Sequence, residues 1–109
     1  MTDFNTALGL AAGEDGTVVL EAGPAHQVAP ETVHFAVLAT LAEVAAARAV
    51  GAPVVPASVS VQLLARARPG RLVGRGRVLR RGRRLAFAEG EVTQEGELVA
   101  KATIAFALL

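Results

Sequence analysis

The sequence predicts a single α+β domain in which one long helix is wrapped by a curved antiparallel sheet of about five strands. The chain has 109 residues, which is the length of one domain. One segment of about 17 residues is apolar on nearly every side, and the second half of the chain alternates between apolar and polar residues with glycine turns between. We therefore expect residues 1–109 to form one domain, without repeats or linkers.

The first strand is predicted at residues 17–23, "TVVLEAG". It follows the polar turn "GEDG" at residues 13–16, contains β-branched residues, and ends at a Gly-Pro pair that stops a strand. The next ten residues, "PAHQVAPETV", are polar or contain proline, so they are expected to form a loop.

The long helix is predicted at residues 34–50, "HFAVLATLAEVAAARAV". Pro30 and Thr32 supply the breaker and the capping residue expected before a helix, and Gly51 with Pro53 ends it. At 1.5 Å per residue this helix is about 25 Å long. Because it is apolar almost all round, we expect protein to surround it.

Four further strands are predicted in the second half of the chain. The turns between them contain Pro69-Gly70, Gly82 and Gly96, and such short connections indicate an antiparallel meander. The four predicted ranges are 58–68, 71–80, 84–93 and 97–109.

The composition limits the core and the cellular context. Hydrophobic residues make up 52% of the chain but aromatic residues only 4%, so Ala, Val and Leu must build the core, and their small size lets backbones approach closely. Apolar surface left over on so short a chain favours a homo-oligomer. Cysteine is absent, which excludes disulfides and thiolate chemistry. Without a leader-like segment or a membrane-length apolar run, the expected protein is soluble and cytoplasmic, with no membrane partner.

Glu43 is the one carboxylate inside the apolar helix. Its neighbours at helical spacing, Ala39 and Ala47, offer no ion pair. Burial of an unpaired carboxylate costs several kcal/mol, so Glu43 either faces solvent, near Arg48, or has a function in a cleft. The residues alone leave both readings open.

The two histidines, His26 and His34, lie on either side of the loop before the helix. Without thiols or a carboxylate cluster they do not predict a metal site, and loop or capping roles are the ordinary reading. The chain also lacks a phosphate-binding glycine loop, so no resident cofactor is expected.

Nine of the eleven Lys and Arg residues lie between Arg66 and Arg84. A nucleic-acid surface would need stacking aromatics, which are scarce, so no nucleic-acid partner is expected. Two readings remain: the arginines solubilise a strand, or "RRGRR", residues 80–84, binds a polyanionic ligand tail.

The order of these segments resembles the hotdog-fold acyl-CoA thioesterases, in their phenylacetate-degradation (PaaI-like) branch. The similarity rests on "VHFAVLATLAEVAAARA", with His34 at the family histidine and Glu43 at the catalytic carboxylate. It continues through "VSVQLLARARPGRLVGRGRVLRRGRRLAFAEGEV" and extends from about Phe4 to the end of the chain.

The resemblance implies a hotdog fold, sheet-edge homodimers that form a dimer of dimers, and active sites at the dimer interface. Glu43 would reach in from the partner's helix as nucleophile or general base. A backbone N–H at the helix start, from Phe35 or Ala36, would hold the thioester oxygen. Coenzyme A would enter as part of the acyl-CoA substrate, with its phosphates on Arg80, Arg81, Arg83 and Arg84.

Three positions depart from the family pattern. Phe35-Ala36 replaces the Gly-Gly pair after the histidine, and Ala47 stands where some relatives have a hydroxyl. Val28 replaces an Asn or Gln, with Gln27 next to it as the candidate substitute. The sequence therefore predicts an acyl-CoA thioesterase, with a non-hydrolytic acyl-CoA-binding protein as the alternative.

Overall fold

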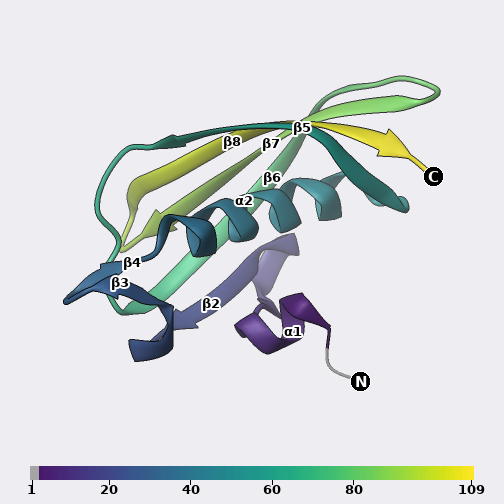
Figure 1. Cartoon of the computed structure of the whole chain (residues 1–109). Helices are drawn as coiled ribbons and strands as arrows, with labels where there is room; N and C mark the ends of the chain where they lie inside the picture. Colours follow the sequence, from purple (N-terminus) through teal and green to yellow (C-terminus); the bar gives the residue numbers. More distant parts are fainter. Residues whose placement is uncertain (1–2) are drawn as a thin grey trace.

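The long helix α2, Phe35–Val50, lies against one face of a curved six-stranded antiparallel sheet (Figure 1). The structure is a computed structural model that describes residues 3–109. The sheet contains β1 (Ala11–Ala12), β2 (Val18–Ala22), β5 (Val54–Leu63), β6 (Gly70–Arg81), β7 (Leu85–Gln94) and β8 (Glu97–Leu108). The remaining elements are α1 (Phe4–Leu8), the 3-10 turns Glu14–Gly16 and Pro24–His26, and a separate ladder of β3 (Gln27–Ala29) with β4 (Thr32–Val33).

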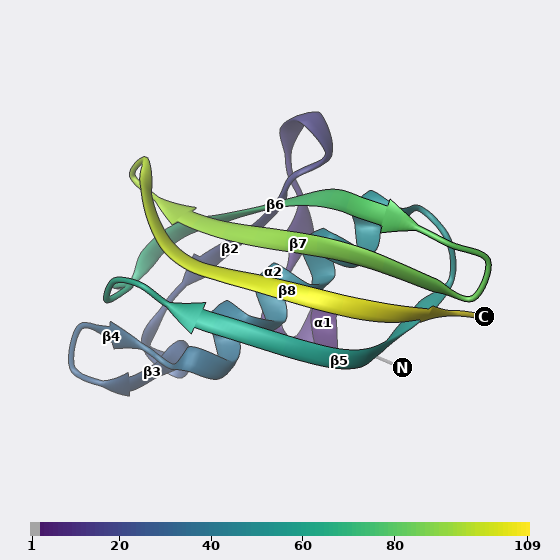
Figure 2. The ribbon, with the colours of Figure 1, turned by 90° about the horizontal axis from the view of Figure 1, so that it is seen from above.

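The strand order is β1-β2-β6-β7-β8-β5. The predicted meander is confirmed for β6, β7 and β8, but β5 pairs with β8 and not with β6. The Pro69-Gly70 turn therefore joins strands that are not neighbours, as Figure 2 shows. The segment between β5 and β6 crosses the open end of the sheet, where the Val33 N–H donates to the Ala67 carbonyl. As a result, β5 lies at an edge with one side unpaired.

Three expectations about element bounds need correction. The strand expected at 58–68 is β5, Val54–Leu63, because the Leu64 and Ala65 N–H groups turn toward the Val99 carbonyl. The expected loop holds the β3–β4 ladder, and β1 adds a sixth strand to the expected five. Two- and three-residue strands are too short to produce a recognisable alternation.

The cap of α2 also differs from the expectation. Thr32 lies in β4, and the N-cap is His34, whose Nδ1 accepts a hydrogen bond from the Ala36 N–H at 2.9 Å. The expected end is confirmed, since Gly51 adopts the left-handed conformation at φ 70°, which glycine tolerates without strain.

Small residues bring α2 into backbone contact with the sheet. Gly76 of β6 and Gly90 of β7 lie opposite each other, and a Cβ on either would overlap the helix backbone at Ala45 or Ala42. The expectation that small side chains permit close approach is thereby confirmed. The most buried large residues of the core are Phe106, Leu20, Leu41, Leu72 and Ile104.

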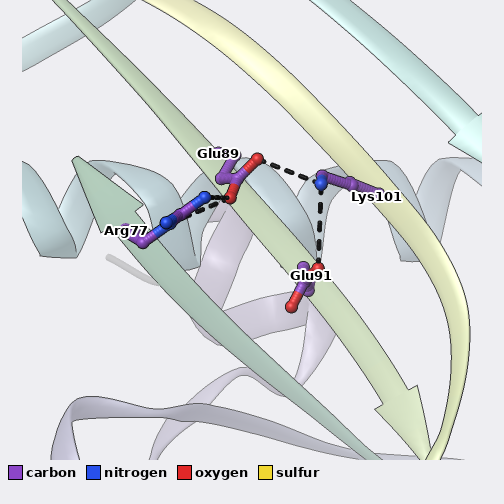
Figure 3. A network of polar contacts seen from close by, with 4 residues as sticks. All are labelled: Arg77, Glu89, Glu91 and Lys101. Atoms are coloured by element: carbon purple, nitrogen blue, oxygen red, sulfur yellow. Dashed lines mark hydrogen bonds and ion pairs between the residues drawn. The ribbon is translucent and has the colours of Figure 1, made fainter. Parts of the chain in front are cut away.

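The other face of the sheet holds a charged network around Glu89, which is only 8% exposed (Figure 3). Arg77 donates to Glu89 from β6, and Lys101 lies 3.2 Å from Glu89 and 3.9 Å from Glu91. Hydrogen bonding to Arg77 and, secondarily, Lys101 lowers the pKa of the Glu89 carboxyl below its ordinary value, although burial opposes this. The network ties three adjacent strands together.

Candidate active site

Glu43 lies midway along α2 and is half-buried. Burial alone raises the pKa of its carboxyl above the ordinary value, because no hydrogen bond or charged neighbour among residues 3–109 contributes. Glu43 and Arg48 line the same depression, of about 530 Å³, but no ion pair joins them within the described part of the chain. The carboxylate is therefore partly desolvated, without an ion-pair partner among residues 3–109, and open to a cleft, which is typical of catalytic acids and bases.

The depression beside Glu43 is built by three parts of the chain. Val44 and Ala47 supply apolar surface from α2, and Val54 closes one side from the start of β5. Asn5 comes from α1, an element that the sequence did not predict. The cleft thus has a polar side at Asn5 and an apolar surface at Val44, Ala47 and Val54.

The start of α2 carries the predicted oxyanion donors. The Ala36 N–H is already paired with His34 Nδ1, whereas the Phe35 N–H has no acceptor among residues 3–109. The His34 and Phe35 rings are stacked with centroids 4.7 Å apart, and Phe35 is 58% exposed. Phe35 is thus the more available of the two amides, and His34 is a capping residue.

Glu43 and the Phe35 amide cannot act together within one chain. They are eight residues apart on a continuous helix, which corresponds to about 12 Å along its axis, whereas a reacting carbonyl must lie within about 3–3.5 Å of both groups. A complete site of this type needs the carboxylate of one copy and the helix start of another.

An apolar groove of about 510 Å³ lies next to the helix start. Val28, 61% exposed, and Phe35 line it together with Leu63 and Leu64 at the end of β5. Sequence reasoning missed these two leucines, although two consecutive large apolar residues at the end of a strand could have indicated an uncovered surface. The predicted substitute, Gln27, is not among the residues that line this groove. Its Oε1 instead accepts a hydrogen bond from the Glu31 N–H at 3.0 Å.

The hairpin arginines are divided between the two faces of the sheet. Arg80 lies opposite the exposed Phe87 and Arg81 opposite the buried Ala86, and residues directly opposite each other share a face. Arg81 accordingly reaches the helix side, where its Nη1 donates to the Val50 carbonyl at 2.9 Å.

Arg83 and Arg84 lie at the turn and are exposed. Neither makes an ion pair within the described part of the chain. The hairpin therefore offers two free guanidinium groups at its tip, while the guanidinium of Arg81 is engaged at the end of α2.

Residues 3–109 hold no group of three or more His, Cys, Asp or Glu arranged to bind a metal. None of the helices in this range is long and apolar enough to cross a membrane.

A long helix wrapped by one curved antiparallel sheet defines a hotdog fold. A model of the acyl-CoA thioesterase N-terminal domain family matches residues 22–107. The chain belongs to this family, which confirms the resemblance found in the sequence.

Solved structures agree with this assignment. A thioesterase-superfamily protein is 31% identical over 99% of this chain and 90% of its own, with a TM-score of 0.88. A mutant of the phenylacetic acid degradation protein PaaI from Thermus thermophilus is 30% identical over 97% of this chain and 98% of its own, with a TM-score of 0.87. A phenylacetic acid degradation-related protein from Ralstonia eutropha is 28% identical over 95% of this chain and 88% of its own, with a TM-score of 0.82. No match was found among curated proteins.

Proposed function

We propose that this protein hydrolyses the thioester of an acyl- or aryl-acyl-CoA at sites shared between two copies of the chain. The observation that carries the proposal is Glu43, a half-buried carboxylate whose pKa is raised by burial and which opens to a cleft. The family supports thioester chemistry, and the eight-residue separation of Phe35 and Glu43 along α2 supports a site shared with a second copy.

In the proposed reaction, ionised Glu43 of one copy takes a proton from water. The water oxygen attacks the carbonyl carbon, and the Phe35 N–H of the other copy donates to the oxygen that becomes negative. The carbon–sulfur bond then breaks, and the thiolate of coenzyme A receives the proton held by Glu43. The products are the free acid and coenzyme A.

A nucleophilic route uses the same residues. Glu43 would attack the carbonyl carbon, release the thiolate and form an anhydride, which water then hydrolyses. A single turnover in ¹⁸O-labelled water tests the nucleophilic route, since label in the Glu43 carboxylate arises when water opens the anhydride at the glutamyl carbonyl. Label in the product acid alone fits the general base and also an anhydride opened at the acyl carbonyl, and rapid-quench detection of an acyl-enzyme separates these two.

The unpaired edge of β5 supports the shared site. Among residues 3–109, this ten-residue strand has β8 as its one neighbour, and it leaves Val59 and Leu63 about half exposed. Antiparallel pairing of two such edges would extend the sheet and cover these side chains. A sheet-edge homodimer, and its pairing into a dimer of dimers, is tested by light scattering with Val59→Pro, which removes an N–H donor on the free edge, since the β5 residues that bond β8 are those in register with Leu64.

The arginines of the β6–β7 hairpin are the proposed contacts of the coenzyme A phosphates. Arg83 and Arg84 at the exposed turn support this, with Arg80 and Arg81 beside them. Charge reversal at residues 83 and 84 should weaken hydrolysis of CoA esters more than that of short pantetheine thioesters. Equal losses on both substrates would contradict the assignment.

The test of hydrolysis is a panel of aliphatic and aryl acyl-CoAs with the wild type and Glu43→Gln. We expect turnover by the wild type and a loss of at least about a hundredfold in the variant. Undiminished turnover would remove Glu43 from the mechanism.

A non-hydrolytic acyl-CoA-binding protein is the alternative function. The observation in its favour is the helix start, where His34 occupies the Ala36 amide and the Phe35 ring stacks on the His34 ring. Tight binding of the panel without turnover would establish this alternative and overturn the hydrolase.

A further inference from the structure

We propose that α1 forms the wall of the Glu43 site, that Asn5 is the polar group which this wall presents to the carboxylate, and that His26 is the positioning residue that holds the wall. This inference rests on the proposed function for its catalytic meaning, but its contacts lie within one chain. No motif in the sequence pointed to Asn5.

Asn5 belongs to the surface around Glu43. It lines the depression that contains Glu43, Val44 and Arg48, and it also lines a second, adjoining depression with Val44 and Arg48. The short helix α1 therefore lies along the outer side of α2, next to the turn that carries the carboxylate. A carboxamide offers both donors and an acceptor, so Asn5 suits a position beside a carboxylate and the water that it activates.

A five-residue helix is too short to be stable alone, so α1 needs fixed contacts. Its N-cap is Asp3, whose Oδ1 accepts from the Thr6 N–H at 2.8 Å, and its C-cap is the left-handed Gly9. The Leu10 N–H returns to the Asn5 carbonyl at 3.0 Å. These bonds shape α1 but do not attach it to the rest of the domain.

His26 makes the polar attachment, in addition to the packing of Leu8 against the core, and uses both ring nitrogens for it. Nδ1 accepts from the Gly23 N–H at 2.9 Å, so Nε2 carries the proton and donates to the Leu8 carbonyl at 2.8 Å, at the end of α1. The backbone of His26 continues the connection, because its carbonyl accepts from the His34 N–H at 2.8 Å. One residue thus links the wall beside Glu43 to the start of α2.

Few other charges influence Glu43 in this arrangement. Arg48 is the other charged residue lining the depression, α1 adds only Asp3 at its N-cap, and the lining residues of β5 and its preceding turn are uncharged. Because burial is the cause of the raised pKa of Glu43, loosening a wall that provides this burial should lower it. A negative charge on the wall should raise it.

The experiment is an NMR titration of the ¹³C-labelled Glu43 carboxyl in the full-length protein, which needs no substrate. We expect His26→Phe to lower the titration midpoint and Asn5→Asp to raise it. Thr6→Asp, with the same charge one residue along α1, should raise it less. Gln94→Ala provides the control for loss of a side-chain tether, since Gln94 bonds the Arg68 backbone at another site.

Steady-state kinetics then test whether Asn5 contributes to hydrolysis. Asn5→Ala should lower kcat/KM about tenfold, as expected if the carboxamide orients the water that Glu43 activates, with an unchanged melting temperature. Equal midpoints for Asn5→Asp and Thr6→Asp, or a midpoint in His26→Phe equal to that of the wild type, would overturn the proposal. If the midpoints shift as expected but no thioester is hydrolysed, the wall stands and the proposed function fails.

Discussion

Gly76 and Gly90 lie opposite each other on β6 and β7, and the backbone of α2 passes directly over the pair. This contact sets the height of the helix above the sheet. It also explains why a core with so few aromatic residues can be closely packed, since Ala42 and Ala45 meet bare backbone in place of side chains.

Gly90→Ala should destabilise the protein by about 3 kcal/mol, because the new Cβ overlaps the Ala42 carbonyl and neither backbone can move freely. Gly23→Ala is the matched control: its Cβ would meet no atom within 4 Å, and its φ of −128° suits alanine. Urea unfolding measures both. Equal stabilities for the two variants would contradict the close helix contact.

Glu89→Gln should lower stability by about 1 kcal/mol at pH 7, since it weakens the bonds to Arg77 and Lys101. The pKa of Glu89 is lowered in the folded state, so its stabilisation is present above the ordinary glutamate value. It is lost as the pH falls through the lowered pKa. Unfolding curves from pH 7 to pH 3 should therefore converge for variant and wild type, whereas a constant gap would argue against ionic bonding.

Glu43→Gln should have the opposite effect on stability. The pKa of Glu43 is raised in the folded state, so its contribution is greatest when the carboxyl is protonated and falls as the pH rises through the raised pKa. At pH 7 the variant should melt above the wild type while losing hydrolysis. A lower melting temperature at pH 7 would indicate that the carboxylate is paired.

The pH–rate profile provides an independent check on Glu43. Because hydrolysis needs the ionised carboxylate, the acid limb of kcat/KM should fall at a pH above the ordinary glutamate pKa. An acid limb at or below the ordinary value would contradict a desolvated base.

Arg81→Ala and Arg84→Ala should separate stability from ligand binding. Arg81 donates to the last carbonyl of α2, so its loss should cost about 1 kcal/mol of folding stability. Arg84 is exposed at the turn, so its loss should raise KM for acyl-CoA with little change in stability. Calorimetry measures the stability of the two variants, and kinetics measures their KM. A stability loss in Arg84→Ala together with a raised KM in Arg81→Ala would contradict these roles.

The sequence predicted the helix and the meander because their periodicity and turn residues are local. Glu43 could be found for the same reason, since a single carboxylate in an apolar helix needs no tertiary information to be noticed. The edge position of β5 could not be predicted, because the strand ends where the Leu64 N–H donates to the Val99 carbonyl, thirty-five residues further along.

Asn5 and the division of the hairpin arginines depend on equally distant contacts. α1 is held by a bond between Leu8 and His26, eighteen residues apart, which no local pattern encodes. The register shift between Val78 and Arg80 decides which arginine faces the helix, and a bulge of one residue is invisible to the alternation of side chains.

The most direct test of the shared site is complementation in mixed dimers. Glu43→Ala removes the carboxylate, and Phe35→Pro removes the amide N–H at the first helical position, where proline is well tolerated. Phe35→Ala is the control that loses the ring and keeps the N–H. Each of the two disabling variants alone should be inactive, and co-expression with two different tags yields the mixed dimer.

Each mixed dimer has one intact site of its two, so the account predicts about half of wild-type hydrolysis in the purified mixed dimer. In the unfractionated pool, where random pairing makes half of the dimers mixed, the expected value is about a quarter. Mixed dimers that stay as inactive as both parents, with Phe35→Ala still active, would contradict a site built from the Glu43 of one chain and the Phe35 amide of the other.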